Sequence, residues 1–349
     1  MEAVVLRAPN QFEVEEVEKP ACPEDGFVVK VMAVGLCGSD IRTFGFGHPK
    51  VKLPHVIGHE VTGVIDEVGA KTTDFKVGER VLINPIIPCG ECAYCKMGLG
   101  NQCANITVVG TQIPGGYAQY VAVPKLAITN DCVLKISDNL AFEYAPLAET
   151  AASVISAQKY ANVQEGDTVL VVGSGPIGCL HTEIAKIRGA KKVIISEISD
   201  SRLDIARNFD AIDVFVNPSK ENLKEVVLRE TDGLGVDVVI CANPVGKTQE
   251  EAFSLVRARG KIIFFGGLPK DNCHITVDSN DVHYREIAVF GAYAYTQKEF
   301  YTAMEYIESG KLPSEKFVTN ILPLKQIKEG IDIAKKGLGI KVVLKPWDN

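Results

Sequence analysis

The sequence has no excess of positive charge. Its 349 residues include 37 Lys and Arg against 44 Asp and Glu, a formal net charge of −7. Proteins that bind phosphate backbones or anionic lipid without sequence specificity do so through a positive field. We therefore expect neither nucleic acid nor a membrane as a partner.

Other features are also missing. No run of about 18 apolar residues is present, which a membrane-spanning helix needs. The opening MEAVVLRAPN lacks the basic stretch, apolar core and cleavage site of a signal peptide, so we expect a cytoplasmic protein. There is no internal repeat. A content of 46% hydrophobic and 23% charged residues is that of a folded protein, and the length favours two domains.

The chain divides into two parts with different sequence patterns. Residues 1–150 alternate short β-rich runs with Gly and Pro, which is typical of a mostly antiparallel sheet or barrel. From 151, solid apolar runs alternate with helical ones, which predicts a parallel sheet covered on both faces. The expected strands are 27–31, 61–68, 80–83 and 117–123, then 169–172, 193–195, 238–240 and 262–265. After about 290, two helical stretches (297–309 and 324–336) and a last strand (341–344) follow.

The expected strand 169–172 runs into the glycine-rich segment GSGPIG and then into a helix with apolar residues three and four apart. Such glycines allow backbone to approach a pyrophosphate at a helix N-terminus. Glu197, 19 residues beyond the last glycine, fits the carboxylate that binds an adenosine ribose. It would repel a 2'-phosphate, which favours NAD over NADP. A structural Gly turn followed by a surface Glu is the alternative. The expected cofactor residues are Gly173, Gly175, Pro176, Ile177, Gly178 and Glu197.

Four cysteines lie within fifteen residues, spaced Cys-x2-Cys-x2-Cys-x7-Cys. Four thiolates can enclose zinc tetrahedrally, which leaves no open position for chemistry, so the site would be structural. An iron-sulfur cluster and unmetallated thiols are the alternatives. The residues are Cys89, Cys92, Cys95 and Cys103.

A second group of metal-ligating residue types is dispersed. It consists of Cys37, His59, Glu60 and Glu149. A thiolate, an imidazole and carboxylates suit zinc and leave a coordination position for water or substrate. Taken alone, the same residues also fit a buried cysteine, a hydrogen-bonded core histidine and surface acids.

The order of these motifs resembles that of the zinc-containing medium-chain dehydrogenase/reductase family, over essentially the whole chain. The Cys-Gly-Ser-Asp run at 37–40, Gly-His-Glu at 58–60, the four-cysteine loop, GGYAQY at 115–120 and GSGPIG carry this resemblance. Within the family the chain is most similar to polyol, sorbitol-like and threonine dehydrogenases. Those enzymes have an acidic residue at the position of Glu149, where alcohol dehydrogenases have a cysteine.

The resemblance implies an α/β protein with two domains. Residues 1–150 and 290–349 would form a GroES-like, mostly β catalytic domain, and 151–289 a Rossmann domain with a doubly wound parallel sheet that binds NAD. The active site would lie in the cleft between them, and the chain would form a homodimer or homotetramer.

The resemblance also implies roles for individual residues. Cys37, His59 and Glu60 would hold a catalytic zinc, with Glu149 binding it directly or through water. Asp40 would orient His59. Ser39 would hydrogen-bond the substrate hydroxyl, and Arg202 would lie along the adenine beside Glu197.

The expected activity is hydride transfer between NAD and a secondary alcohol, with two zinc ions per chain. The substrate would be a polyol, sugar or sugar phosphate, and L-threonine is the alternative. A nucleotide-binding protein without catalysis is an alternative of another class.

Two residues depart from the family pattern. Arg42 stands where many members have a proton-relaying histidine, and a guanidinium cannot serve as a base. It would bind cofactor pyrophosphate or an anionic substrate, or lie at the surface, and Ser39 with water or Glu149 would carry the proton. Ala294 stands where sorbitol enzymes have an arginine.

Overall fold

The computed structural model describes residues 1–348, which form two compact units. The split unit comprises Met1–Ala152 and the segment from Tyr295 onward, and the inserted unit comprises Ser153–Ala294. Helix α4 (Leu147–Tyr160) contains the first boundary. Among the described residues, no helix has both the length and the apolar character needed to cross a membrane.

The split unit is built mainly from strands. They are β1 (Glu2–Ala8), β2 (Gln11–Glu16), β3 (Phe27–Gly35), β4 (Glu60–Val68), β5 (Arg80–Ile83), β6 (Ile86–Ile87), β7 (Thr107–Val108), β8 (Tyr120–Val123), β9 (Val133–Lys135), β16 (Val318–Pro323) and β17 (Lys341–Lys345). Its helices are α1 (Gly38–Phe46), α2 (Ala93–Lys96), α3 (Lys125–Thr129), α10 (Gln297–Glu308), α11 (Ser314–Phe317) and α12 (Ile327–Lys336), with short 3-10 turns η1 (Gly100–Gln102) and η3 (Leu324–Gln326).

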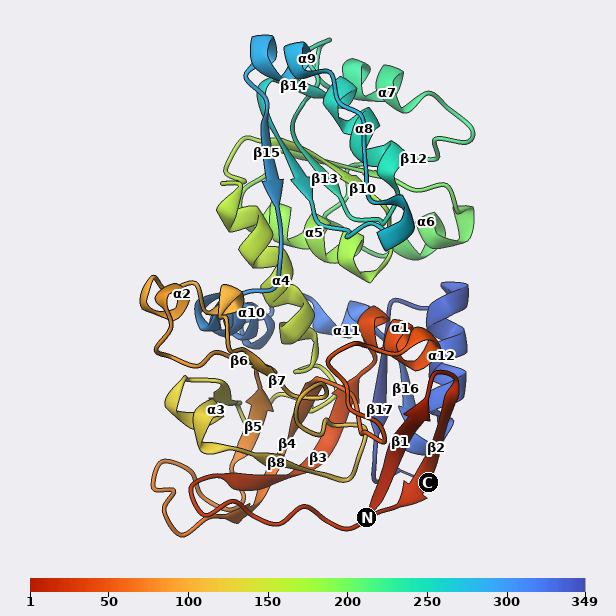
Figure 1. The fold of residues 1–349 in the computed structure, drawn as a ribbon. Coiled ribbons are helices and arrows are strands. Elements are labelled where there is room, and N and C mark those ends of the chain that lie inside the picture. Colours follow the sequence, from red (N-terminus) through yellow and green to blue (C-terminus); the bar gives the residue numbers. More distant parts are fainter. Residues whose placement is uncertain (349) are drawn as a thin grey trace. The chain divides into compact units, whose positions relative to one another are not determined.

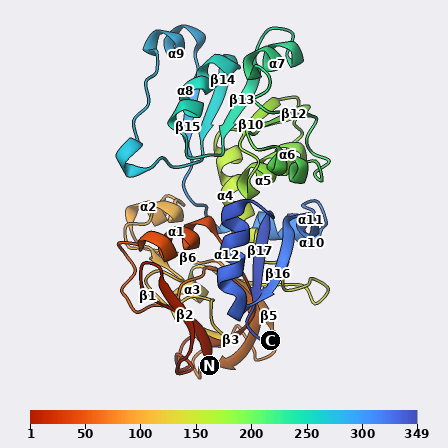
Figure 2. The same ribbon diagram turned by 90° about the vertical axis from the view of Figure 1, so that its right-hand side faces the viewer.

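The two ends of the chain share one sheet in the split unit. Its strand order is β16-β17-β3-β4-β5-β9, and β8 also pairs with β3. β17 lies antiparallel to β3, with Val343 opposite Gly35, so blue C-terminal strands adjoin red N-terminal ones in Figure 1. Figure 2 shows α12 beside β16 and β17. The antiparallel pairing of β3, β4 and β5 confirms the mostly antiparallel sheet predicted for residues 1–150.

The position of β3 follows from its composition. Its sequence FVVKVMAVG is rich in β-branched residues, which pack well on a pleated surface. All but Lys30 and Met32 of its nine residues are buried. Phe27 and Tyr117 are among the largest fully buried side chains of the core around it.

The inserted unit contains a six-stranded, wholly parallel sheet. Its strands are β10 (Thr168–Val172), β11 (Lys192–Ser196), β12 (Val214–Val216), β13 (Val236–Cys241), β14 (Val256–Phe264) and β15 (Ala288–Gly291), in the order β12-β11-β10-β13-β14-β15. Its helices are α5 (Pro176–Ile187), α6 (Asp200–Ala206), α7 (Leu223–Glu230), α8 (Gly246–Leu255) and α9 (Ser279–Arg285), with η2 at Lys270–Asn272. The predicted parallel sheet is therefore confirmed.

The strand order reverses beside β10. The chain moves from β10 outward through β11 and β12, then crosses to β13 on the other side of β10. Ligands of open α/β sheets bind outside the carboxyl ends of the strands at such a switch point. The GSGPIG segment begins directly after β10, so the fold places it there.

Candidate functional site

The pairing of β3 with β4 brings the first group of metal-ligating residues together. Gly35, the last residue of β3, is opposite Glu60, the first residue of β4. Cys37 follows β3 by two residues and His59 precedes β4 by one, so both lie at the same end of this strand pair. One ligand atom from each of Cys37, His59 and Glu60 lies within 4.8 Å of the others.

Asp40 fixes the orientation of His59. Its Oδ1 lies 3.1 Å from His59 Nδ1, and its Oδ2 accepts hydrogen bonds from Tyr117 Oη at 2.6 Å and from the Cys37 backbone N–H at 3.3 Å. A histidine held through Nδ1 leaves Nε2 free for a metal, which is the usual arrangement in metal sites.

Gly58 allows this packing. Its φ is +99°, which favours glycine, and a Cβ atom there would lie 2.9 Å from the ring of Tyr117. The glycine of the Gly-His-Glu run is therefore required by the turn before β4 and by the aromatic ring beneath it.

Glu60 is fully buried and only one of its oxygens is satisfied within the protein. Oε1 accepts hydrogen bonds from Thr150 Oγ1 at 3.0 Å and from the ammonium of Lys341. Oε2 is buried without a hydrogen-bond partner, and a Cβ at Gly35 would lie 1.8 Å from it. A buried carboxylate oxygen without a donor is costly, and a metal ion would satisfy it. The donor set of one thiolate, one imidazole and one carboxylate thus fits zinc.

Opposing effects set the charge of two buried groups beside the site. Burial raises the pKa of Asp40, but His59, Tyr117 and the Cys37 N–H lower it by more, so the net shift is downward. Burial lowers the pKa of Lys341, but Glu60 and the other acidic groups around it together raise it by more, so the net shift is upward. Both side chains are therefore held in their charged forms.

Glu149 does not join the three-residue group. It lies in the first turn of α4, and its Oε1 accepts a hydrogen bond from Tyr295 Oη at 2.9 Å. Its pKa is raised, chiefly by burial and further by repulsion from Glu60, although His59 and Tyr295 oppose the shift.

The four cysteines 89, 92, 95 and 103 form a second, separate group, with one sulfur from each within 4.8 Å of the others. The Cys92–Cys95 sulfurs are 3.5 Å apart, and the Cys89–Cys95 and Cys92–Cys103 sulfurs are each 3.9 Å apart. Corners of a tetrahedron with zinc-sulfur bonds of about 2.3 Å lie about 3.8 Å apart. All four thiols are unbridged, so their spacing fits one zinc ion.

The glycine-rich segment of the inserted unit has the local geometry expected of it. Gly173 has a φ of +106° and donates its N–H to the carbonyl of Ser196 at 2.7 Å. A Cβ at Gly178 would lie 1.9 Å from the Gly173 carbonyl oxygen, whereas one at Gly175 would meet nothing within 4 Å. Pro176 opens helix α5, a position where its missing N–H costs nothing.

Glu197 is tied to this loop. It follows β11, and its Oε2 accepts the backbone N–H of Ser174 at 3.0 Å while Oε1 accepts that of Ser199 at 3.1 Å. Arg202 lies 4.0 Å from Oε2. Val172 pairs with Ser196 in parallel strands, so the loop and Glu197 emerge at one edge of the sheet. A ribose hydroxyl at this edge would find a fixed acceptor.

Three further residues singled out in the sequence have clear positions. Ser39 and Arg42 both lie on the exposed side of α1, which begins directly after Cys37. Ala294 is the last residue of the inserted unit and adopts a φ of +53°, which is uncommon for a residue with a side chain.

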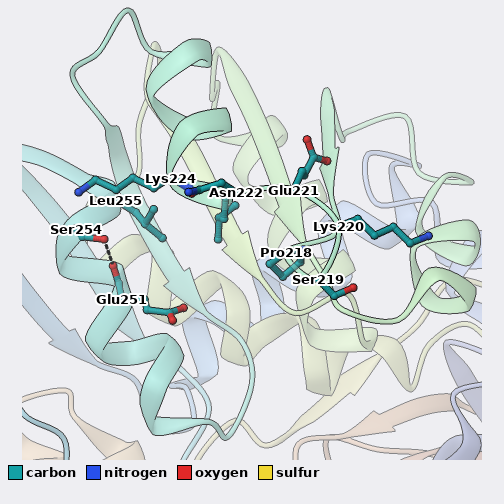
Figure 3. Close-up of a pocket in the computed structure, with 10 residues that line it drawn as sticks. Pro218, Ser219, Lys220, Glu221, Asn222, Lys224, Glu251, Ser254 and Leu255 are labelled. Carbon is teal, nitrogen blue, oxygen red and sulfur yellow. Dashed lines mark hydrogen bonds between the residues drawn. The ribbon is translucent and has the colours of Figure 1, made fainter.

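A pocket of about 560 Å³ in the inserted unit contains none of the predicted site residues. Its lining comes from the loop after β12, the start of α7 and the later part of α8, and the lysine and glutamate side chains point in different directions (Figure 3). Lys220 is already paired with Asp200 at 2.6 Å. The side chains converge on no common point, so the pocket is not the cofactor site expected at the GSGPIG loop.

Comparison with known families identifies the chain. The profile of the alcohol dehydrogenase GroES-like domain matches residues 23–138, and that of zinc-binding dehydrogenases matches residues 176–309. A sorbitol dehydrogenase from Bombyx mori is 31% identical over 348 residues, which is 98% of this chain and 97% of the relative. The chain belongs to the zinc-containing medium-chain dehydrogenase/reductase family. The resemblance inferred from the motifs is therefore confirmed, and so is the GroES-like plus Rossmann fold.

Other members of the family extend this similarity. A D-arabitol-phosphate dehydrogenase from Enterococcus avium is 32% identical over 349 residues, covering 99% of this chain and 97% of its own. Among solved structures, a short chain alcohol dehydrogenase (rspB) from Escherichia coli complexed with NADH has a TM-score of 0.89 and 28% identity, and covers 99% of both chains.

Several residues of this dehydrogenase family member contribute to the site but were not found from the sequence. They are Thr150, Lys341, Tyr117 and Tyr295. None belongs to a metal-ligand or nucleotide motif. Tyr117 lies within the GGYAQY run, which was part of the family resemblance. This run was the one sequence signal that could have pointed to any of the four residues.

Proposed function

We propose that the chain is a zinc- and NAD-dependent oxidoreductase that transfers hydride between NAD and a secondary alcohol, which is a polyol, sugar or sugar phosphate. The observation that carries this proposal is the convergence of Cys37, His59 and Glu60, with one oxygen of Glu60 buried and unpartnered. Names of the relatives, a sorbitol dehydrogenase and a D-arabitol-phosphate dehydrogenase, support the substrate class.

Cys37, His59 and Glu60 would hold the catalytic zinc, and Glu149 would approach it directly or through water. When bound, zinc supplies a Lewis acid that favours ionisation of the substrate alcohol. Asp40 holds His59 through Nδ1, and we propose that this contact keeps Nε2 directed at the metal. The Ser39 hydroxyl, two residues beyond Cys37, would accept the hydrogen bond of the substrate hydroxyl.

The four-cysteine loop would hold a second zinc with a structural role. Four protein ligands complete a tetrahedral site, so no position remains for substrate. This loop is distinct from the Cys37 group, and the two would account for two zinc ions per chain.

The inserted unit would be the NAD-binding domain and the split unit the catalytic domain. The N-terminus of α5, with the N–H groups of residues 173–178, would receive the pyrophosphate. Glu197 would accept a hydrogen bond from the adenosine ribose and disfavour NADP, with Arg202 along the adenine. The NADH complex of the rspB structure supports the choice of cofactor.

A cytoplasmic homodimer or homotetramer is part of the proposal. The unbridged thiols of the four-cysteine loop support a reducing compartment. Strand β15 ends the parallel sheet and pairs only with β14 among the described strands, so its free edge supports association with a second copy. Analytical ultracentrifugation of the zinc-loaded protein would measure the assembly.

A substrate screen tests the proposed activity. The purified protein, with its zinc content measured, is incubated with NAD and with polyols, polyol phosphates, simple secondary alcohols or L-threonine, and NADH formation is followed. We expect oxidation of polyols or their phosphates, and loss of that activity in Cys37→Ala. Turnover restricted to L-threonine, or no turnover with zinc bound, would contradict the proposal.

A further inference from the structure

The segment after Asp40 is positively charged although the whole chain is acidic. Between Ile41 and His59 there is no Asp or Glu, while Arg42, Lys50 and Lys52 all occur there. All three basic side chains are exposed. In the described part of the chain none of them forms an ion pair. The segment thus presents three uncompensated cations.

This charge lies next to the proposed catalytic group within the same unit. Helix α1 begins directly after Cys37, and residues three apart on a helix share a face. Ser39 and Arg42 therefore point from the same exposed face, and Arg42 is about 7.5 Å along the helix axis from Cys37. A substrate whose hydroxyl reaches Ser39 would extend over Arg42.

The fold holds this segment in place. The β1-β2 turn residue Asn10 donates its backbone N–H to the Phe44 carbonyl at 2.6 Å and its side-chain amide to the Gly45 carbonyl at 3.0 Å. Beyond the helix, the Lys50 N–H is donated to His48 Nδ1 at 3.2 Å. Arg42 thus lies on a helix whose C-terminal end is held by Asn10, and Lys50 lies in a turn beyond that end.

The cofactor has a separate phosphate site in its proposed binding domain. The GSGPIG loop and the start of α5 offer backbone N–H groups for the pyrophosphate. Arg is suited to bind a phosphate by two parallel hydrogen bonds, and lysines add charge.

We propose that Arg42, with Lys50 and Lys52, binds a phosphate monoester carried by the substrate, so that the substrate class is polyol or sugar phosphates. This inference rests on the proposed function, which it narrows. The alcohol carbon gives its hydride to NAD and the hydroxyl proton goes to solvent, while the phosphate stays unchanged and anchors the molecule.

Matched substrate pairs test the inference. NADH formation is measured at constant ionic strength with D-arabitol and D-arabitol 1-phosphate, and with D-sorbitol and D-sorbitol 6-phosphate. We expect the phosphorylated member to have a kcat/KM at least about tenfold higher, as one charged hydrogen-bond pair provides. Inorganic phosphate should compete with the polyol phosphate but not with NAD.

Substitutions in the basic segment test whether it causes the preference for phosphorylated substrates. Arg42→Gln should reduce the ratio of kcat/KM for phosphorylated over unphosphorylated polyol about tenfold, and the pair Lys50→Gln with Lys52→Gln should reduce it several-fold. Arg42→Lys should retain part of it because the charge remains. Lys336→Gln, an exposed lysine at the end of α12, removes the same charge elsewhere and should leave the ratio unchanged.

The outcomes separate the inference from the proposed function. Equal kcat/KM for both members of each pair, or an unchanged ratio in Arg42→Gln, overturns the phosphate inference and leaves the polyol dehydrogenase standing. A raised KM for NAD in Arg42→Gln with an unchanged ratio assigns the guanidinium to cofactor pyrophosphate instead. Absence of turnover with every polyol, phosphorylated or not, overturns the proposed function itself.

Discussion

The ammonium of Lys341 hydrogen-bonds the carboxylate of Glu60, although 281 residues separate them in sequence. The two side chains are 5% and 0% exposed. They meet because β17 from the end of the chain pairs with β3, and β3 pairs with β4. Charge is thus balanced inside the split unit by residues from opposite ends of the chain.

Removing one member of this buried pair should be costly. Lys341→Met leaves the Oε1 atom of Glu60 buried without its ammonium partner, so we expect the free energy of unfolding to fall by about 3–5 kcal/mol. Urea denaturation of the zinc-loaded protein measures this. Lys345→Met, on the same strand but paired at the surface with Asp348, is the control and should cost less than about 1 kcal/mol. Equal losses in the two variants would contradict the prediction.

This pair also illustrates what the sequence could not reveal. The GSGPIG loop and the four-cysteine loop were recognisable because each is contained in a short stretch whose spacing reflects local backbone geometry. Lys341 reaches Glu60 through strand pairing between distant parts of the chain, and Thr150 reaches it from helix α4. An isolated lysine or threonine carries no spacing signal. The parallel sheet was predictable from its solid apolar runs, as in β10 and β13.

Other misses have local causes. The strand expected at 117–123 begins at Tyr120, because Tyr117 turns inward to hydrogen-bond Asp40 and the Gly35 carbonyl. The short edge strand β15 (Ala288–Gly291) has too few residues to show a pattern. Glu149 was expected to bind the zinc directly or through water; its carboxylate is hydrogen-bonded by Tyr295 and lies outside the group of three ligand atoms, and its role at the metal stays a prediction.

Metal analysis distinguishes the two cysteine-containing groups. The purified protein should contain two zinc ions per chain by elemental analysis, one for each group of ligands. Cys37→Ala should retain one zinc and lose dehydrogenase activity, because it opens the proposed catalytic site. Iron in place of zinc, or near-full activity of Cys37→Ala, would be incompatible with this assignment.

The four-cysteine loop should respond differently to substitution. Cys92→Ser removes one of four ligands from a site without an open position, so stability or assembly should suffer more than the chemistry. We expect a lower Tm by differential scanning calorimetry and loss of one zinc. A variant that keeps both zinc ions and the parent Tm would show that Cys92 is not a ligand.

Glu197 should control the choice of dinucleotide. Glu197→Ala removes the carboxylate that would repel a 2'-phosphate, so the ratio of kcat/KM for NAD over NADP should fall by about tenfold or more. The variant also loses the acceptor of the Ser174 and Ser199 N–H groups, so the NAD KM should rise. Glu221→Ala, an exposed acid of the same unit, serves as the control. An unaltered ratio in Glu197→Ala would place cofactor discrimination elsewhere.

His181 in α5 should make the protein sensitive to mild acid. It is fully buried, Gln158 Nε2 lies 3.1 Å from its Nδ1, and the Phe265 ring packs edge-on against it. Burial lowers the pKa of His181 from 6.5 to about 3. Folding thus favours the neutral imidazole, and the stability that this neutral side chain contributes is fully present above pH 6.5.

The sign of the pH effect follows from proton uptake. Below pH 6.5 the unfolded chain binds a proton at His181 that the folded chain does not, so stability falls as the pH falls towards 3. The loss approaches about 1.4 kcal/mol per pH unit, which amounts to about 1.4 kcal/mol between pH 7.5 and 5.5. His181→Leu removes the titrating group and should lessen the acid loss by that amount.

Urea unfolding of the parent and His181→Leu at pH 7.5 and 5.5 measures this difference. Comparing the two pH values within each protein cancels any packing cost of the substitution, and protonation of the zinc ligands affects both proteins alike. Gln158 keeps a partner in the variant because its Nε2 also donates to the backbone carbonyl of residue 181 at 2.8 Å. His283→Gln, at an exposed position in α9, should retain the full acid loss of the parent. If His181→Leu loses as much stability on acidification as the parent does, the buried imidazole is not the source of the acid sensitivity.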